Sequence, residues 1–265
     1  SSKLAIAILL LWVGAVLIDP LLQTTPDRIH LEAILAPPSS DYLLGNDALG
    51  RSVAERLLAG ARVALLVAVV TVLISASVGT LLGAISGYAG GVTDTIISRI
   101  IDVMLAFPGI LLAIALAAIL GPGIDNLVIA ISVVGWVGYA RLARAQALSL
   151  KQREHVTAAV ALGSRQGRII LRHIIPLMLA PLLVEASFGI AAVIVAEAGL
   201  SFLGLGVQPP QASWGSMIRE GAQFLLVAPH LALFPGLAIF LVVLSANLFG
   251  DWLRSRLDVR EERLQ

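Results

Sequence analysis

The segment "REHVTAAVALGSRQGRIILRHIIP", residues 153–176, carries four arginines and two histidines between two long apolar runs. The whole chain is 58% hydrophobic and 13% charged, and its mean hydropathy is +0.94. A soluble domain is usually about one quarter charged. This contrast indicates a membrane protein in which residues 153–176 form a polar loop between two membrane-spanning helices.

Long apolar runs recur on both sides of this loop. A bilayer core of about 30 Å requires about 20 apolar helical residues. The first run, residues 4–18, also fits the apolar part of a signal peptide, but no small-residue cleavage site follows it, so we expect an uncleaved first transmembrane helix within residues 1–20. The other predicted spans are 63–86, 96–120, 127–150, 177–200 and 231–253. The predicted fold class is an all-α integral membrane protein with six transmembrane helices.

The distribution of lysine and arginine predicts the orientation of these helices. If the first span starts in the cytoplasm, thirteen of the 18 basic residues lie on the cytoplasmic side and five on the outer side. The positive-inside rule predicts this bias, so we expect both termini to be cytoplasmic, with residues 253–265 as a cytoplasmic tail. The five outer basic residues are Arg28, Arg51, Arg56, Arg62 and Arg219.

Two outer segments are too polar or too rich in turn residues to be spans. Residues 21–60 have mixed charge and several prolines, which predict an irregular segment that ends in a short amphipathic helix near residues 51–59. Residues 201–230 form a long outer loop rich in glycine, proline and aromatic residues. We expect this loop to re-enter in part or to lie along the membrane interface, with Trp214 and Phe224 at that interface.

The loop 151–176 itself predicts a helix, a sharp turn and a second helix on the cytoplasmic face. One side of the first helix comprises Val156, Ala159, Val160 and Gly163. Gly163 suits the positive φ that ends a helix, and Ser164 is a good cap for the next one. Three basic residues then follow at helical spacing: Arg165, Arg168 and Arg172. A plainer interpretation is a basic loop that only fixes topology and contacts anionic lipid.

The loop resembles the "EAA…G…P" loop in the permease subunits of type I ATP-binding-cassette importers. The matching residues are Ala158, Ala159, Gly163 and Pro176. The resemblance extends to the second permease subunit of the dipeptide/oligopeptide/nickel branch. It rests further on "LLGNDALGRSVAERLLAGARVAL" (43–65), "GYAGGVTD" (87–94), "LAFPGILLAIAL" (105–116), "AEAGLSFLGLGVQPPQASWGSMI" (196–218) and "ANLFGDWLRSRLDVR" (246–260). Thr157 stands where the family has glutamate; either Glu154, one turn earlier, replaces that charge, or the charge is dispensable.

The resemblance implies that residues 61–252 form the ABC type-1 transmembrane core and that the loop 151–176 docks on a cytoplasmic ATPase. The implied coupling residues are Glu154, Thr157, Ala158, Ala159, Gly163, Arg165, Arg168, Arg172, His173 and Pro176. The implied partners are a homologous sister permease, one or two ATPase subunits that bind ATP and Mg²⁺, and an extracytoplasmic substrate-binding protein. The implied location is a bacterial or archaeal cytoplasmic membrane, and no nucleic acid is involved. Peptide is the expected substrate, and nickel or another small solute is the alternative.

Several residues within the spans are candidates for the translocation path or a gate. Glu185 and Glu197 lie in the predicted fifth span, about 120° apart around the helix. Acids at membrane depth usually face a cavity or the bundle interior, so each is either a path residue or a buried structural acid. Pro108 is expected to kink the third span, as a gate or for packing.

Two further groups of residues have a functional and a structural interpretation. Candidates for contact with a binding protein are Asn46, Asp47, Arg51, Gln208 and Trp214. The stretch "GNDALGR", residues 45–51, fits equally well as a packed structural plug. Gly79, Gly83 and Gly87 suit close helix packing, and we favour packing within the chain over packing against a sister subunit.

Other functional classes are disfavoured by what the sequence lacks. The chain has no cysteine and four scattered histidines, and no HExxH motif, so we expect no metal, cofactor or catalytic residues. It has no GxxxxGK[ST] loop, so ATP hydrolysis must belong to a partner. A secondary transporter typically shows an inverted repeat, and an intramembrane hydrolase needs a paired nucleophile and base; neither is evident. A channel would differ from an importer by ATP-independent flux.

Overall fold

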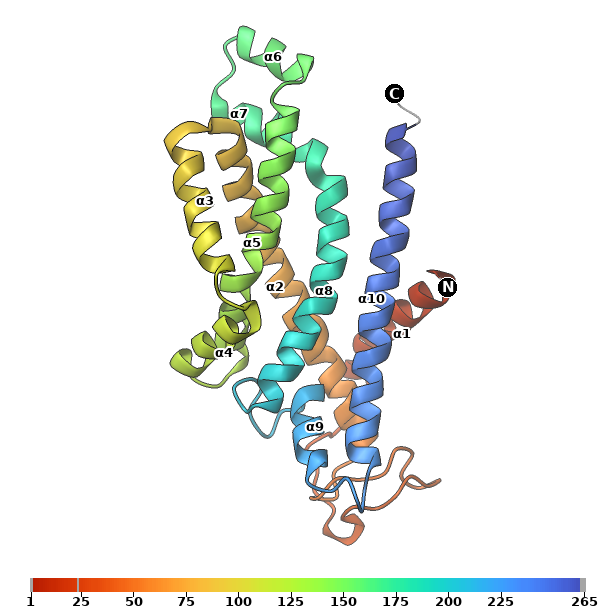
Figure 1. Ribbon diagram of the computed structural model, residues 1–265. Coiled ribbons are helices and arrows are strands. Elements are labelled where there is room, and N and C mark those ends of the chain that lie inside the picture. Colours follow the sequence, from red (N-terminus) through yellow and green to blue (C-terminus); the bar gives the residue numbers. More distant parts are fainter. Residues whose placement is uncertain (1, 23, 263–265) are drawn as a thin grey trace. The chain divides into compact units, whose positions relative to one another are not determined.

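The computed structural model describes residues 2–22 and 24–262, which are mostly helical (Figure 1). The helices are α1 (Ser2–Leu22), α2 (Val53–Ala89), α3 (Gly91–Leu105), α4 (Gly109–Leu120), α5 (Ile124–Leu150), α6 (Glu154–Ala161), α7 (Gln166–Ile169), α8 (Leu179–Phe202), α9 (Trp214–Ala222) and α10 (His230–Glu262). A π-helical turn (Ile170–Ile174) and a 3₁₀ turn (Ile175–Met178) join α7 to α8, and a further 3₁₀ turn spans Leu31–Ala33. Within the described residues, β-pairing is limited to one isolated bridge, Asn46 to Ser52. The end of the predicted tail, residues 263–265, lies outside the described residues.

The helices long and apolar enough to cross a membrane agree with the predicted fold class. Over the described residues they are Ser2–Leu22, Val53–Ala89, Ile124–Leu150, Gln166–Phe202 and His230–Leu257. The pair α3 and α4 qualifies as a sixth span when counted together, although it is bent by 88°. Pro108 lies at this break, where its missing N–H cannot continue the helical ladder. The all-α, membrane-spanning fold and the bend at Pro108 are therefore confirmed.

The start of α2 differs from the prediction. The amphipathic helix expected near residues 51–59 is not separate, because α2 begins at Val53 and continues without interruption to Ala89. A helix of 37 residues is about 55 Å long and exceeds the bilayer core. Arg56 lies in its first turns and is only 1% exposed. Because Arg56 is charged, the hydropathy pattern predicted that the span begins after it. In the structure, carboxylates from other segments lie close to Arg56 and allow it to be buried.

The fold consists of two compact units, which we describe separately. Unit 1 comprises Ser1–Val70, Ile114–Ala130 and Ile190–Phe249, and unit 2 comprises Thr71–Ala113, Ile131–Gly189 and Gly250–Gln265. The boundaries fall inside α2, α4, α5, α8 and α10. These helices therefore contribute one segment to each unit.

In unit 1, the long loop after α8 packs on the helices through a pair of tryptophans. Ser213 caps α9 in a reciprocal capping box with Ser216. The Nε1–H of Trp214 donates to the carbonyl of Leu57 (2.9 Å), and its ring centroid lies 6.2 Å from that of Trp12. Trp214 is 2% exposed, so its ring packs within the protein, and its place at the membrane interface stays a prediction.

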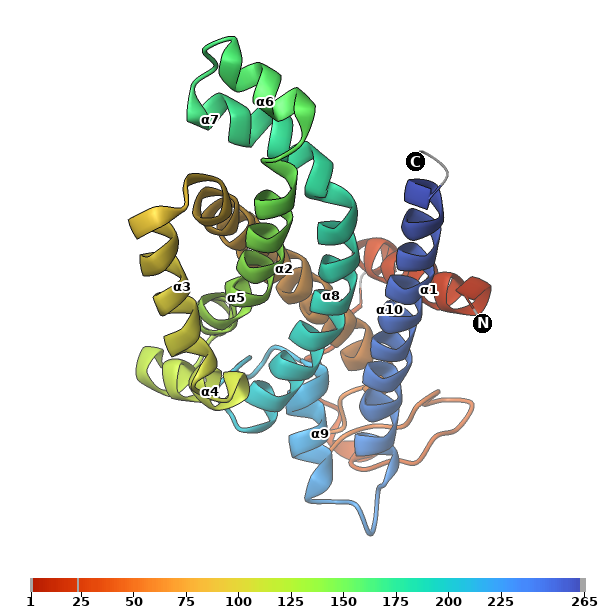
Figure 2. The ribbon, with the colours of Figure 1, turned by 45° about the horizontal axis from the view of Figure 1, so that its top comes forward.

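In unit 2, three glycines of α2 bring this helix against the backbone of α5. A Cβ atom at Gly79, Gly83 or Gly87 would collide with the carbonyl of Trp136, Ala140 or Arg144, respectively. The predicted packing of these glycines within the chain is confirmed. Ile101 of α3 is buried with Val137 and Ala140 of α5, and α3 lies beside α5 (Figure 2).

Candidate functional site

The loop between α5 and α8 folds as a helical hairpin at one end of unit 2. Helix α6 lies beyond the end of α5 in both views, and α7 leads back from it towards α8 (Figures 1 and 2). Gly163 reverses the chain at φ +78°. The amide of Gly163 donates to the carbonyl of Val160 (2.9 Å) and that of Ser164 to Ala159 (3.0 Å), which is the Schellman pattern. The predicted helix–turn–helix is therefore present.

Two details of the hairpin differ from the prediction. Val156 and Ala159 are buried as expected, but Val160 is 52% exposed, so the buried face of α6 is narrower than the predicted one. The second helix begins at Gln166 after Arg165 and has no side-chain cap, so Ser164 does not serve as its N-cap. Pro176 lies in the 3₁₀ turn just before α8, which agrees with its predicted place at the entry to that span.

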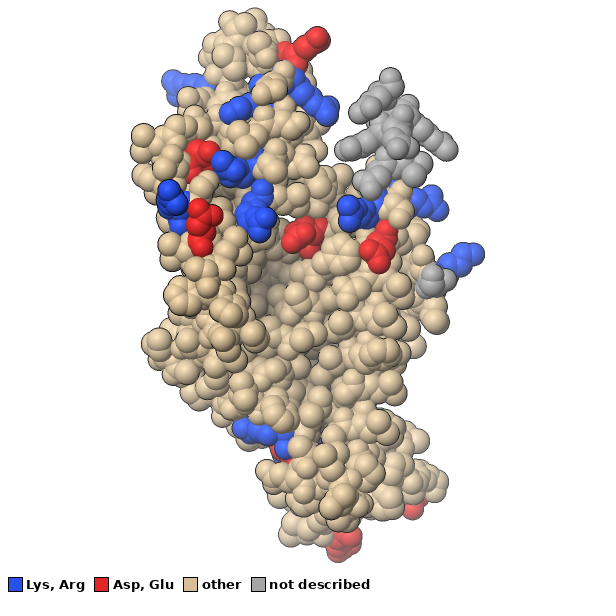
Figure 3. All heavy atoms as spheres, in the orientation of Figure 1, with Lys and Arg blue, Asp and Glu red and all other residues tan. Residues whose placement is uncertain are grey.

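The outer surface of the hairpin is apolar and basic. Leu162 is 87% exposed and Leu171 is 60% exposed, in addition to Val160. The exposed predicted coupling residues are Glu154, Thr157, Ala158, Gly163, Arg165, Arg168, Arg172 and Pro176, and His173 is half-buried. On the visible face of unit 2, charged side chains gather over α6, α7 and the start of α3 (Figure 3). Exposed leucines amid arginines are typical of a protein-binding surface.

Ion pairs and hydrogen bonds attach the end of α5, just before the hairpin, to the turn between α2 and α3. Arg144 donates to both carboxylate oxygens of Asp94, at 2.6 and 2.7 Å, and the hydroxyl of Ser86 donates to the same carboxylate. The ammonium of Lys151 donates to the carbonyl of Gly87 at 3.1 Å. Sequence analysis did not predict these contacts, and the only local signal is the acid in the first turn of α3.

The two acids of the predicted fifth span have different surroundings. Glu197 belongs to unit 1, is 1% exposed and accepts a hydrogen bond from Ser201 at 2.7 Å. The Ser201 hydroxyl in turn accepts from the amide of Val207 at 3.3 Å, so the acid anchors the loop after α8. These contacts favour the structural interpretation of Glu197. Glu185 belongs to unit 2 and is half-buried at the wall of a pocket.

The predicted outer contact residues are mostly buried in unit 1. Asn46, Asp47 and Arg51 are between 2% and 8% exposed, and Trp214 lies inside as described above. Gln208 is exposed, and its side-chain amide donates to the carbonyls of Gly204 and Gly206, both at 3.0 Å. Burial favours the packed plug over a contact surface for residues 45–51.

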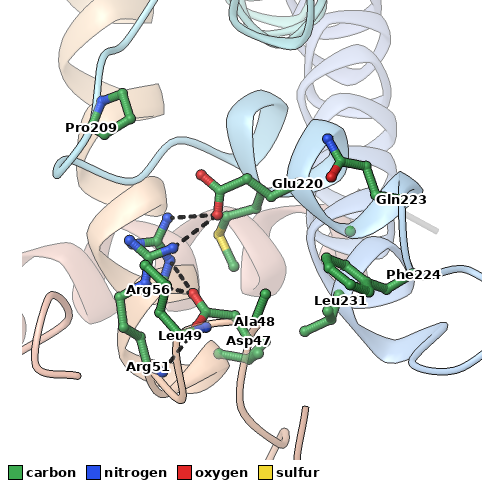
Figure 4. A pocket seen from close by; sticks show the side chains of 13 residues that line it. Asp47, Ala48, Leu49, Arg51, Arg56, Pro209, Glu220, Gln223, Phe224 and Leu231 are labelled. Carbon is green, nitrogen blue, oxygen red and sulfur yellow. Dashed lines mark hydrogen bonds and ion pairs between the residues drawn. The ribbon is translucent and has the colours of Figure 1, made fainter. Parts of the chain in front are cut away.

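Two arginines and two carboxylates hold this plug in place beside a pocket of about 300 Å³ (Figure 4). The Asp47 carboxylate accepts from the amides of Leu49 and Arg51 and pairs with the Arg51 guanidinium at 2.6 Å. Glu220 of α9 lies 3.0 Å from Arg51 and 3.4 Å from Arg56. Sequence reasoning missed Arg56 and Glu220, because their 164-residue separation leaves no local signal.

Among the described residues, no group of three or more histidine, aspartate or glutamate side chains is placed to hold a metal ion. The described residues offer two features for function: the hairpin surface at one end of unit 2, and the pocket beside Glu185 in the same unit.

Comparison with known proteins gives a consistent result. Residues 79–263 match the family described as "Binding-protein-dependent transport system inner membrane component". A glutathione transport system permease protein of Pectobacterium atrosepticum is 46% identical over 83% of this chain and 73% of its own length. A dipeptide transport system permease protein of Alkalihalophilus pseudofirmus is 44% identical over 97% of this chain and 86% of its own. A probable D,D-dipeptide transport system permease protein of Escherichia coli K12 is 42% identical over the same shares.

A solved structure has the same fold. An inward-facing methionine ABC transporter contains a chain that superposes with a TM-score of 0.61, covering 75% of this chain and 95% of that one. The sequence identity is 16%, so this similarity concerns the fold alone.

Proposed function

This chain belongs to the family of inner-membrane components of binding-protein-dependent transport systems and is a permease subunit of an ABC importer; we propose that it imports peptides together with a sister permease. The observation that carries the substrate class is identity of 42–47% to glutathione and dipeptide permeases over 83–97% of the chain. Nickel, the alternative from sequence analysis, has no such support.

The energy for import comes from partner subunits. The sequence has two lysines, Lys3 and Lys151, and neither lies in a phosphate-binding loop. ATP and Mg²⁺ therefore bind to cytoplasmic ATPase subunits, and the membrane chain converts their motion into alternating access. An extracytoplasmic binding protein delivers the peptide to the outer side.

The α6–α7 hairpin is the contact that receives this motion. Its exposed leucines and arginines offer an apolar centre and a basic rim, which is the usual composition of a protein interface. Thr157 takes the place of the family's glutamate, and its hydroxyl donates to the carbonyl of Arg153 at 3.3 Å within α6. The side chain therefore supports the helix rather than adding charge to the docking surface.

Co-purification of the assembled transporter tests the hairpin. Leu162→Asp places a charge in the exposed apolar centre and is expected to reduce recovery of the ATPase subunits and ATP-dependent peptide uptake at least about tenfold. Val92→Asp is the matched control, because Val92 is also apolar and 76% exposed in unit 2 but lies outside the hairpin. Normal recovery and uptake with Leu162→Asp would remove the hairpin from the coupling path.

The substrate class has its own test. The reconstituted transporter, with its binding protein, is expected to accumulate a labelled dipeptide in an ATP-dependent manner and to leave nickel outside. Accumulation of nickel and not of peptide would overturn the proposed substrate, and flux without ATP would identify a channel.

A further inference from the structure

A pocket of about 350 Å³ lies within unit 2, between α5, α8 and the last part of α10. Its polar lining comes from Gln146, Glu185 and Arg254, and Phe188 and aliphatic side chains complete its walls. All three helices are apolar enough to cross a membrane. Polar side chains in such helices usually face a water-filled cavity or a pathway.

Glu185 is the side chain that gives this pocket its character. It is half-buried on α8, and within the described part of the chain no hydrogen bond or ion pair engages its carboxylate. A Cβ atom at Gly138 of α5 would lie 3.2 Å from the Glu185 Oε1 atom. The carboxylate therefore lies close to the α5 backbone at a position without a side chain, next to a cavity.

The Glu185 carboxylate is half-buried, so burial removes part of its hydration, and a cationic group that enters the pocket can replace what is lost. The pocket volume is at the lower end of the usual range for small-molecule sites, about 300–1,000 Å³, which suits a dipeptide or the end of a longer peptide. The side-chain amide of Gln146 adds a second polar group to the pocket wall. A carboxylate that is unpaired within the described residues, in a pocket of this size, matches the ammonium end of a peptide.

We propose that this pocket binds the α-ammonium group of a peptide during its passage, with Glu185 as the acceptor. This assignment rests on the proposed peptide import and names the group of the substrate that the permease itself recognises. Glu185 touches the substrate, while Gly138 provides the space for its carboxylate.

The sequence of this chain has no cysteine, so labelling measured on this chain alone tests the site within the complete transporter, reconstituted in lipid nanodiscs. Gln146→Cys introduces one thiol into the pocket, and methanethiosulfonate reagents of similar size but opposite charge probe it. With Glu185 present, the cationic reagent is expected to react faster than the anionic one, and Glu185→Gln is expected to reduce this preference at least about fivefold. Asp102→Asn, which neutralises an exposed acid of unit 2 outside the pocket, is expected to leave the preference unchanged.

Peptide protection then identifies the ligand. Dialanine at millimolar concentration is expected to slow the labelling of Gln146→Cys severalfold, whereas N-acetyl-dialanine is not, and Glu185→Gln is expected to abolish the difference. Glu185→Asp, which keeps the charge, is expected to retain it. If Glu185→Gln does not assemble, the comparison of the two peptides with Glu185 intact still decides the matter.

Three results would overturn the assignment: equal protection by both peptides, a preference for the cationic reagent that survives Glu185→Gln, or a thiol at position 146 that reacts with neither reagent. The last would mean that a partner covers the pocket. A separate uptake assay distinguishes this failure from that of the proposed function. If the unmodified transporter imports dialanine but the thiol shows no protection, only the site is wrong; if it imports no peptide, the proposed function fails as well.

Discussion

A single buried arginine explains how an irregular segment is fixed in unit 1. Arg56 is 1% exposed, and its guanidinium lies 3.4–3.6 Å from carboxylate oxygens of Glu220, Asp47 and Asp27. A buried charge is tolerated only when other groups replace its hydration. Arg56 therefore joins the segment before α2 to α9, and this role is structural.

The Arg56 guanidinium offsets part of the negative charge of Asp47 and Glu220, and its removal leaves that part of the charge without an ion-pair partner. We expect Arg56→Ala to lower the free energy of unfolding by about 3–5 kcal/mol, measured by chemical denaturation in mixed micelles. Arg62→Ala, on the same helix but exposed, is expected to change it by less than about 0.5 kcal/mol. Equal effects of the two substitutions would show that the ion-pair cluster contributes nothing specific.

At this scale sequence analysis identified the motif but predicted neither of the contacts that Arg51 makes. The Asp47–Arg51 pair has a spacing of four residues and lies in a motif that sequence analysis identified. The contact of Arg51 with Glu220 joins positions 169 residues apart, and no periodicity encodes it. Sequence analysis proposed Asp47 and Arg51 as contacts for a partner protein. In the structure their charged groups already form ion pairs within the chain.

At the scale of elements, glycine spacing controls how closely α2 approaches α5 in unit 2. The added Cβ at Gly83 would meet the carbonyl of Ala140, and backbone atoms cannot move aside as a side chain can. Packing of this kind replaces the hydrophobic effect in membranes, where lipid is as apolar as the helix surface.

Gly83→Ala is therefore expected to destabilise the protein by at least about 2 kcal/mol, despite the higher helix propensity of alanine. Gly14→Ala in α1 is the matched control, because nothing lies within 4 Å of its added Cβ, and we expect it to be neutral or stabilising by up to about 1 kcal/mol. Thermal unfolding of the purified chain measures both. A neutral Gly83→Ala would mean that the two helices separate without penalty.

The bidentate pair of Asp94 and Arg144 connects α3 to α5, which continues towards the hairpin. Its side chains are 21% and 35% exposed, so its contribution to stability is small, about 1 kcal/mol. We expect its value for transport to be geometric, because the pair holds the first turn of α3 against α5.

A charge reversal tests this connection. Arg144→Asp is expected to reduce ATP-dependent uptake severalfold because it places two acids together, and the double substitution Asp94→Arg with Arg144→Asp is expected to restore most of it. The measurement is uptake per ATP hydrolysed by the reconstituted transporter. Failure of the double variant to exceed either single variant would contradict a pairwise contact.

The length of the apolar runs predicted the number of membrane-spanning segments well, but it predicted poorly the residues at which they begin and end. A hydropathy window ends a span at a charge, so it placed the start of the second span at residue 63, whereas pairing of Arg56 lets α2 begin at Val53. Pro108 predicted a bend, but the 88° angle depends on the packing of α3 and α4, which composition does not encode.

For the whole molecule, the balance of basic residues predicts which surfaces face the cytoplasm. Electrostatic retention of lysine and arginine during insertion orients helices with their basic ends inside. The hairpin 151–176 carries a cluster of arginines, while residues 24–52 carry few. Import by the proposed mechanism requires these segments to lie on opposite sides of the membrane.

Two cysteine variants in the cysteine-free chain decide this topology. Leu162→Cys and Leu43→Cys both replace strongly exposed leucines, at 87% and 78% exposure. A membrane-impermeant maleimide is expected to label Leu43→Cys in intact cells and Leu162→Cys only in inside-out vesicles. Labelling of both positions from the same side would contradict the predicted orientation and, with it, the proposed docking of the hairpin on a cytoplasmic ATPase.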